Sequence, residues 1–288
     1  MKKITKVLLI TLTVLILIPT LYANSCFIEA QKLMNLEPIS EKVDEYTEKS
    51  EYIPFDEINK DFVNAVVATE DKRFFTRKGF DWIALARAVI VNIVSGKKRE
   101  GGSTLSQQIA KNLYFQSSSR GIKEKIEEVA IMLQLEDDYS KEELFALYAC
   151  MNYYGDGYWG LNSAAKGYYN LDQKELSLAK CAMLAGIPNA PGLMQLSTGY
   201  DLAKKRQEKV LNRMLDEQYI SEEEYKQIKE AIDNGDTTCT LKVDSIMEPE
   251  NGTSYDVVGY IPGKSHDQQI LFAGHYDMYF TGFQDDCS

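Results

Sequence analysis

Two glutamates are placed where they could carry out acid–base chemistry. Glu70 directly follows Asp61–Thr69, an apolar run with the composition of a buried helix. A carboxylate at the end of such a helix is partly shielded from water, which suits a general base. Glu128 belongs to a second, separate helical pattern. Glycosyl chemistry requires two such carboxylates, because one handles a proton and the other balances charge at the anomeric centre or the leaving group. Residue type alone is a weak indication, since most glutamates are simply solvated.

A glycine turn and two lysines could bind an anionic ligand. Two glycines open the segment Gly101–Thr104 and permit a tight turn before the helix expected at Ser103–Phe115. Backbone amides and hydroxyls at the start of that helix could bind a phosphate group. Lys111 and Lys125 would add positive charge. Lys125 lies three residues before Glu128 and therefore shares a helix face with it.

These residues need a helical frame to position them. Apolar residues recur at helical spacing from residue 61 to residue 232, without strand–helix alternation or an internal repeat. The expected helices are Asp61–Thr69, Trp82–Ser95, Ser103–Phe115, Ile122–Leu133, one opened by the capping box Ser140–Glu143, Asn162–Tyr169, Leu176–Gly186, Leu202–Leu215 and Ser221–Ile232. The sequence therefore predicts a mainly α fold. Short strands are expected after it, at Thr237–Val243, Val257–Ile261 and Ile270–Ala273.

Two segments have the character of membrane contacts. Three lysines precede the uncharged run Val7–Ala23, which is close to the minimum length for spanning a bilayer. It reads as an uncleaved anchor or, as the alternative, a signal peptide; in both cases the rest of the chain is expected outside the membrane. Trp82–Ser95 is apolar on more than one face and is followed by the cations of Gly96–Arg99. This fits a helix at the membrane interface or an ordinary core helix with a solvated basic end.

Composition excludes some classes of protein. The net charge of -11 argues against a nucleic-acid-binding protein, which would present a basic face. The five cysteines show no metal-binding spacing. Small buried thiols are therefore expected in preference to a disulfide framework. These cysteines are Cys26, Cys150, Cys181, Cys239 and Cys287.

Several motifs follow one another in a recognisable order. Residues 70–74 read Glu-Asp-x-x-Phe, and residues 101–112 read Gly-Gly-Ser-Thr-x-x-Gln-Gln-x-x-Lys-Asn. Further motifs fall at Glu124–Glu128, Tyr153–Gly160 and Glu175–Pro191. Together they resemble the peptidoglycan glycosyltransferases of glycosyltransferase family 51, which include the glycan-polymerising domains of class A penicillin-binding proteins and their monofunctional relatives. The resemblance covers residues 50 to 225, and its second motif is highly specific.

The resemblance implies a lysozyme-like helical fold with a small membrane-embedded subdomain at Trp82–Arg99, and it favours the interface interpretation of that helix. The substrates would be lipid II and the growing glycan strand. Glu70 would deprotonate the 4-hydroxyl of the acceptor GlcNAc, whose oxygen attacks the anomeric carbon of MurNAc. Undecaprenyl pyrophosphate would leave, and the linkage would invert to β-1,4. Glu128 would organise the leaving-group side; no cofactor is required, although Mg²⁺ or Mn²⁺ could assist there.

The resemblance also implies a set of substrate-binding residues, with Lys111 and Lys125 on the pyrophosphate. The full set is Asp71, Phe74, Gly102, Ser103, Thr104, Gln107, Gln108, Lys111, Asn112 and Lys125. Two positions depart from the family pattern. Arg77 stands where a histidine is expected, and Glu124 stands where an arginine is expected unless Arg120 replaces it. These departures leave the rate and the metal dependence open.

The C-terminal tail carries a different pattern. Tyr255–Gly263 and Ile270–Asp277 resemble the opening of a di-zinc aminopeptidase-type domain. His275, Asp277 and Asp286 would be remnants of its metal site, and no metal binding is expected from the chain as it stands. A truncated or decayed fusion accounts for this better than a working peptidase does, and a chance match is the alternative.

The sequence thus predicts four parts: 1–23, an anchor or signal; 24–49, a juxtamembrane segment; 50–236, a glycosyltransferase domain; and 237–288, an incomplete metallopeptidase-like tail. The leading function is polymerisation of lipid II by a single-pass membrane protein with its catalytic domain outside the cell. One alternative is a catalytically weak scaffold that binds other cell-wall synthesis proteins, and another is a membrane-anchored metallopeptidase.

Overall fold

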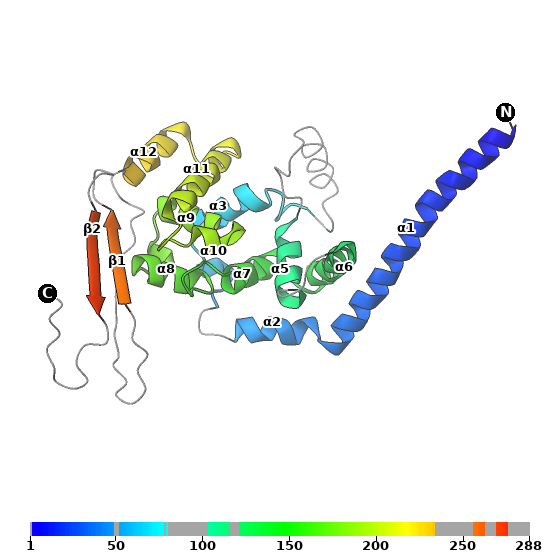
Figure 1. Cartoon of the computed structure of the whole chain (residues 1–288), viewed down its shortest axis with the longest axis horizontal. Coiled ribbons are helices and arrows are strands. Elements are labelled where there is room, and N and C mark those ends of the chain that lie inside the picture. Colours follow the sequence, from blue (N-terminus) through cyan, green and yellow to red (C-terminus); the bar gives the residue numbers. More distant parts are fainter. Residues whose placement is uncertain are drawn as a thin grey trace. The chain divides into compact units, whose positions relative to one another are not determined.

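The computed structural model describes residues 2–48, 52–77, 79, 103–115 and 121–233 and two strands, 256–262 and 269–275. The chain divides into two compact units, Met1–Cys239 and Thr240–Ser288 (Figure 1). The longer helices of the first unit are α1 (Lys2–Leu36), α2 (Ile39–Thr47), α3 (Lys60–Glu70), α5 (Leu105–Tyr114), α6 (Ile122–Asp138), α7 (Lys141–Met151), α8 (Leu161–Tyr169), α9 (Leu178–Gly186), α11 (Tyr200–Asp216) and α12 (Glu222–Asp233). A short α10 (Pro191–Met194) and three 3-10 turns, Phe55–Glu57, Gln173–Glu175 and Ile187–Asn189, complete this set.

The prediction of a mainly α fold is confirmed for the described residues. The predicted capping boxes also form: the hydroxyls of Ser140 and Ser221 accept from the amides of Glu143 and Glu224, each at 3.2 Å. Trp82–Ser95 and Thr237–Val243 lie outside the described residues.

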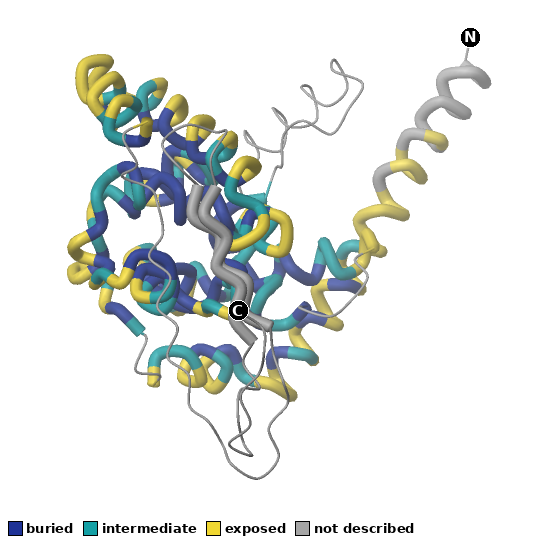
Figure 2. Tube along the Cα trace, turned by 60° about the vertical axis from the view of Figure 1, so that its left-hand side comes forward, coloured by how far each residue is buried: buried dark blue, intermediate teal, exposed yellow. Residues whose placement is uncertain are grey.

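Helices far apart in the sequence surround one apolar core, and Figure 2 shows their buried residues in dark blue. Phe145 on α7 is at its centre and is fully buried. The rings of Phe62 on α3, Phe74 and Phe55 lie 6.4, 6.2 and 5.8 Å from it between centroids. Rings at these distances gain edge-to-face attraction in addition to burial. The segment that carries Glu70 is therefore packed on both sides, through Phe62 before it and Phe74 after it.

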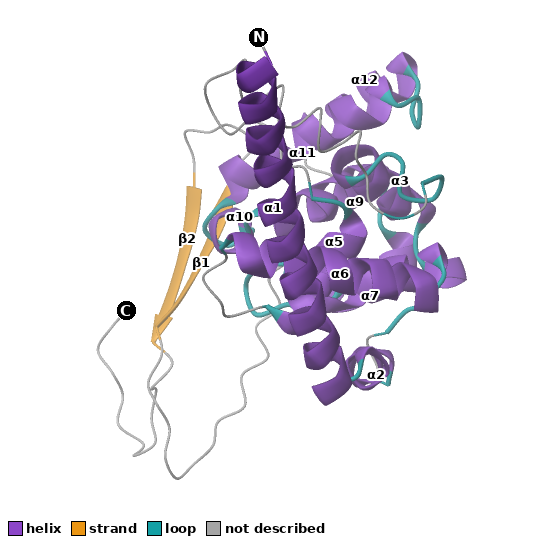
Figure 3. Cartoon of the chain, turned by 90° about the vertical axis from the view of Figure 1, so that its right-hand side faces the viewer, coloured by secondary structure: helices purple, strands orange, loops and turns teal. Residues whose placement is uncertain are grey.

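The N-terminal helix has two halves of different character. Within the described residues, one helix, Thr13–Leu36, is long and apolar enough to cross a membrane. Its second half also packs against α6 (Figure 3). Cys26, Ala30 and Met34 recur every four residues and are buried, so they form one face. The helix continues into the predicted juxtamembrane segment as far as Leu36, with Pro19 inside it, and Pro38 follows its end.

The second unit contains a two-stranded antiparallel hairpin. Strand β1 (Asp256–Pro262) pairs with β2 (Gln269–His275), with Asp256 opposite His275 and Pro262 opposite Gln269. Two of the three predicted strands are thus confirmed. A lone hairpin of this kind is marginally stable in water.

Among the cysteines, Cys26, Cys150 and Cys181 are free and buried. The prediction of buried thiols is confirmed for these three. Cys239 and Cys287 lie outside the described residues.

Candidate active site

Glu70 ends α3, and both oxygens of its carboxylate are held by side chains from other helices. Arg206 on α11 donates from Nη2 to Oε1 at 2.7 Å. Gln108 on α5 donates from Nε2 to Oε2 at 3.1 Å. An ionised carboxylate has about four acceptor positions, so each oxygen can accept one further proton donor. The two bonds fix the direction of the carboxylate while leaving it able to act as a base.

Arg206 was not predicted from the sequence. It lies 136 residues after Glu70 in the chain and reaches it across α9. Gly186 on α9 makes room for it, because a Cβ at that glycine would lie 2.8 Å from Cγ of Arg206. One signal was available: Arg206 falls between Ala203 and Val210, which are buried positions of the amphipathic helix α11. A cation at that place on a helix usually has a partner.

The carboxylate of Asp71 is directed at the start of α5. Its Oδ2 accepts from the backbone amide of Leu105 at 3.3 Å. Thr104 and Gln107 form a reciprocal capping box: the Thr104 amide donates to Gln107 Oε1 at 2.9 Å, and the Gln107 amide donates to Thr104 Oγ1 at 3.3 Å. All three of these side chains belong to buried residues. The amides of Thr104, Leu105 and Gln107 are therefore satisfied by the protein itself. Contact of Asp71, Thr104 and Gln107 with a substrate stays a prediction.

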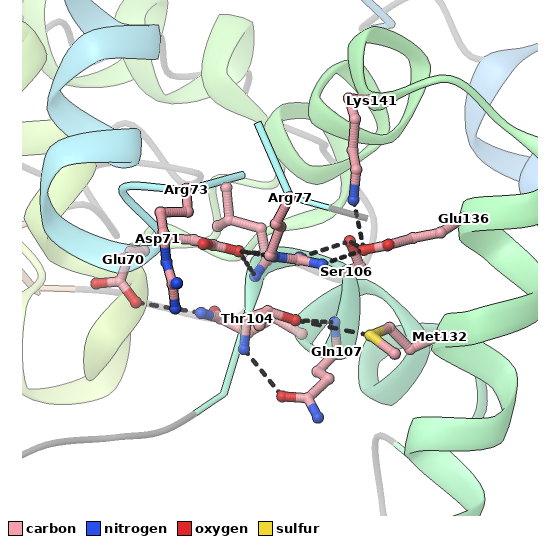
Figure 4. Close-up of polar contacts among 12 residues, drawn as sticks. Glu70, Asp71, Arg73, Arg77, Thr104, Ser106, Gln107, Met132, Glu136 and Lys141 are labelled. Atoms are coloured by element: carbon pink, nitrogen blue, oxygen red, sulfur yellow. Dashed lines mark hydrogen bonds and ion pairs between the residues drawn. The ribbon is translucent and has the colours of Figure 1, made fainter. Parts of the chain in front are cut away.

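Arg77 is the centre of a buried ion-pair cluster, which Figure 4 shows between α6, α7 and the start of α5. Its Nη2 lies 3.0 Å from Asp71 Oδ2, and its Nη1 lies 2.7 Å from Glu136 Oε1. Lys141 reaches the same oxygen of Glu136 at 2.6 Å. The hydroxyl of Ser106 donates to Glu136 Oε1 at 2.5 Å. Two cations and two carboxylates thus balance one another, and we refer to Asp71, Arg77, Glu136 and Lys141 as the buried quartet.

The quartet perturbs the ionisation of Glu136, Arg77 and Lys141. Burial by itself would raise the pKa of Glu136, but hydrogen bonds from Lys141 and Ser106 and the charge of Arg77 outweigh burial and lower that pKa. Burial works against the charged form of Arg77, yet Asp71 and Glu136 prevail and raise its pKa. Burial lowers the pKa of Lys141. Glu136 therefore contributes stability above the pKa of a free glutamate, and this contribution is lost as the pH falls through its lowered pKa.

A second polar group joins α6 to the entrance of α5. Glu128 is buried, with 1% of its side chain exposed, and forms a short ion pair with Lys125. Lys125 also donates from Nζ to Ser103 Oγ at 3.0 Å. The other oxygen of Glu128, Oε2, has no hydrogen-bond partner within the described part of the chain. The prediction that Lys125 and Glu128 share one helix face is confirmed, and the two form an ion pair. Gln108, in the first turn of α5, contacts the carboxylate of Glu70. Ser103, two residues before α5, contacts Lys125, which pairs with the carboxylate of Glu128. The start of α5 therefore lies between the two carboxylates.

The remaining predicted residues have different surroundings. Asn112 donates from Nδ2 to Oδ1 of Asn152 at 3.2 Å, and Lys111 is half-buried on the same helix. Phe74 is completely buried beneath Lys141, whose Nζ lies 5.0 Å from the ring centroid. Its ring is part of the apolar core, and contact of Phe74 with a substrate stays a prediction. Gly102 lies outside the described residues.

Glu124 caps its own helix. Its Oε2 accepts from the amide of Gly121 at 2.8 Å, and this bond lowers the pKa of Glu124 together with that to its own amide. An acidic residue in the first turn also suits the helix dipole. Glu124 therefore has a local structural reason to stand where the family pattern has arginine. Arg120 lies outside the described residues.

The described residues include no cluster of three or more His, Cys, Asp or Glu side chains that could hold a metal ion. Glu128 Oε2 is a hard oxygen that fits Mg²⁺ or Mn²⁺, but only with substrate and water oxygens as the other ligands. In the tail, His275 ends β2, whereas Asp277 and Asp286 lie outside the described residues.

The loop Tyr153–Gly160 supports the far end of α5. Asn152, which precedes it, accepts through its backbone oxygen from the amide of Gly160 at 2.9 Å. Asp156 is held by the hydroxyl of Tyr168 at 2.9 Å and by the amide of Ser197 at 3.1 Å. The loop is thus tied to α8 and to the segment before α11, and it places Asn152 against Asn112.

A pair of glycines in this loop provides a test of its geometry. Gly160 has φ 82° and ψ 152°, and a Cβ there would lie 2.8 Å from the carbonyl oxygen of Cys150. Gly157 has φ 84° but open space around it. We expect Gly160→Ala to lower the free energy of unfolding by about 3 kcal/mol, since strained backbone and a backbone clash add. Gly157→Ala should cost only about 1 kcal/mol. Urea unfolding of both variants measures the difference, and equal losses would contradict this account of the loop.

Known proteins share sequence with this chain. The family model described as Transglycosylase matches residues 36–215. Penicillin-binding protein 1F of Bacillus subtilis is 39% identical over 179 residues, which are 62% of this chain and 25% of that protein. Penicillin-binding protein 1A of Vibrio cholerae is 37% identical over 173 residues, which are 60% of this chain and 21% of that protein. The crystal structure of penicillin-binding protein 1A from Haemophilus influenzae matches 48% of this chain and 17% of its own, with 26% identity and a TM-score of 0.31.

The chain spans about a quarter or less of the length of these curated relatives. The family model, in contrast, covers more than half of the chain, including α3, α5, α6 and α11, which carry the site. The chain therefore belongs to the transglycosylase family.

Proposed function

We propose that this chain is a peptidoglycan glycosyltransferase that polymerises lipid II into β-1,4-linked glycan strands. The observation that carries the proposal is the carboxylate of Glu70, held by Arg206 at 2.7 Å and by Gln108 at 3.1 Å at the end of a buried helix. Membership of the transglycosylase family supports the same chemistry. Glu128, on a separate helix, supplies the second carboxylate that glycosyl chemistry requires.

In the proposed reaction Glu70 accepts the proton of the acceptor 4-hydroxyl. The oxygen then forms a bond to the anomeric carbon of MurNAc at the reducing end of the growing chain. The bond from that carbon to the pyrophosphate oxygen breaks, and its electron pair leaves with undecaprenyl pyrophosphate. Attack opposite to the leaving group inverts the α-linkage to β. Arg206 and Gln108 keep the base in one orientation, which reduces the entropy lost in reaching the transition state.

The leaving pyrophosphate is assigned to the side of α6. Lys125 is 43% exposed, although it pairs with Glu128, so its ammonium can still meet an anion. Ser103 shares that ammonium and can donate its hydroxyl to a phosphate oxygen. Lys111 on α5 would add a second cation. Glu128 would help to hold a divalent cation, which would supply positive charge on the leaving-group side, although none is required.

We also propose a location at the cell membrane, anchored by α1 with the catalytic unit outside. Thr13–Leu36 meets the length and hydropathy requirement. Lysines precede the apolar part and would stay on the cytoplasmic side. The packing of α1 on α6 would hold the leaving-group side of the site close to the membrane that carries the lipid substrate. Other cell-wall synthesis proteins are further proposed partners.

Purified full-length chain in detergent, incubated with lipid II, tests this function. We expect glycan strands as the product. A muramidase should cut these strands back to disaccharide units, because a muramidase cleaves the β-1,4 linkages between MurNAc and GlcNAc. Binding of lipid II without any strand would overturn the proposed activity and favour a scaffold. Zinc-dependent release of amino acids from peptides would favour the metallopeptidase alternative.

A further inference from the structure

The buried quartet contains a cation, Arg77, which contacts two of the described residues predicted to bind the substrate: it pairs with Asp71, and its Cζ lies 5.9 Å from the ring centroid of Phe74. The side chain of Arg77 is 7% exposed, and those of Asp71 and Glu136 are each 5% exposed. A guanidinium so deeply buried cannot serve as a phosphate ligand. Its effect on the reaction must pass through the residues that it holds.

Arg77 holds two separate parts of the site together. Its Nε and Nη2 donate to Asp71 Oδ2 at 3.2 and 3.0 Å, and that oxygen also accepts the amide of Leu105. Asp71 is the residue after Glu70, and Leu105 opens the helix that carries Gln108. The chain of contacts therefore runs from Arg77 through Asp71 to both sides of the Glu70–Gln108 hydrogen bond.

The other side of the guanidinium is fixed as firmly. Nη1 donates to Glu136 Oε1 and to the carbonyl of Gly79, each at 2.7 Å. Nη2 also donates to Ser106 Oγ at 3.3 Å, one residue after Leu105. Planar guanidinium matches this set of acceptors in several directions at once, which the single ammonium of lysine cannot do.

We propose that Arg77 is a positioning residue that sets the placement of Glu70 relative to α5, and that it does so through Asp71 and not through its charge alone. The inference rests on the proposed glycosyltransferase function. Its consequence is a loss of turnover with little change in substrate affinity, since a displaced base reduces the rate of the chemical step while the lipid-binding groups remain in place.

The test separates geometry from charge balance. Arg77→Gln leaves two buried carboxylates against one cation, and we expect its unfolding midpoint to fall by roughly 5–15 °C. The double variant Arg77→Gln with Glu136→Gln leaves Asp71 and Lys141, whose opposite charges balance. We expect it to recover most of the midpoint, while kcat stays about 10–100-fold below that of the unaltered chain and KM changes less than about 3-fold. Arg77→Lys should give an intermediate kcat.

Lys72→Gln is the matched control, because Lys72 lies two residues after Glu70 but is 43% exposed and pairs with Glu217. It should leave kcat and the midpoint unchanged.

Recovery of both stability and kcat in the double variant would overturn the proposal, because charge balance would then suffice. A full kcat in Arg77→Gln or in Arg77→Lys would also overturn it.

Hydrogen exchange gives a readout that does not depend on activity. We expect faster amide exchange over residues 103–115 in the double variant than in the unaltered chain, because Leu105 loses a fixed acceptor. Unchanged exchange there would overturn the proposal even if no glycan formed. Absence of glycan from the unaltered chain would instead count against the proposed function, so the two failures are distinguishable.

Discussion

Glu70→Gln is expected to reduce glycan formation by a factor of about 10³, within the range that a positioned general base contributes. Glutamine has nearly the same shape, and its amide oxygen can still accept from Gln108 or Arg206. It cannot accept the proton of the acceptor hydroxyl at neutral pH. The rate of strand formation from lipid II, measured under single-turnover conditions, checks this expectation.

The matched control is Glu217→Gln. Glu217 is a glutamate paired with a cation, Lys72, at 2.9 Å, close in the fold to the end of α3. Removing its charge should change the rate less than about 2-fold, because a surface ion pair contributes little. If Glu70→Gln retained a tenth or more of the rate while binding lipid II normally, another group would have to be the base.

The second large effect is expected from Lys125→Met. This change removes the cation from Glu128, whose side chain is 1% exposed, and it removes a proposed pyrophosphate contact. An unpaired buried carboxylate costs several kcal/mol, but Lys125 is 43% exposed, so we expect a loss of about 2 kcal/mol in unfolding free energy. The rate of strand formation should fall about 100-fold, since a charge-assisted contact to the leaving group is lost.

Lys123→Met separates these two contributions. Lys123 lies on the same helix and pairs with another buried glutamate, Glu127, at 3.4 Å. Its loss should lower stability by a smaller amount and leave the rate nearly unchanged, because it is not assigned to the substrate. Equal losses of rate in the two variants would show that Lys125 acts only through the stability of α6.

Local features of the site could be predicted from the sequence. The i,i+3 spacing of Lys125 and Glu128 placed both on one face of α6, and the structure pairs them. The apolar run before Glu70 predicted the buried helix α3. Serine followed three residues later by glutamate predicted the starts of α7 and α12. Each of these depends on groups within one turn of each other, so the sequence contains all the necessary information.

The orientation of side chains at the start of α5 could not be predicted in this way. A glycine turn before a helix suggests free amides for a phosphate, yet Asp71 occupies the Leu105 amide, and Thr104 and Gln107 cap one another. The motif gives the residue types but not the directions in which their side chains and amides point. Whether a polar group faces a ligand or the protein depends on which other segment approaches it.

For this protein, the sequence by itself determined the helical class of the fold, the positions of Glu70 and Glu128 on separate helices, and the family pattern that suggested their chemistry. Only the tertiary structure decided that Arg206 reaches Glu70, because that contact joins residues 136 positions apart across the gap left by Gly186. It also decided that Arg77, which departs from the family pattern, is neutralised within the buried quartet. Both outcomes have one physical reason: burying a charge is unfavourable without a partner, and the partner is supplied by the packing of distant helices.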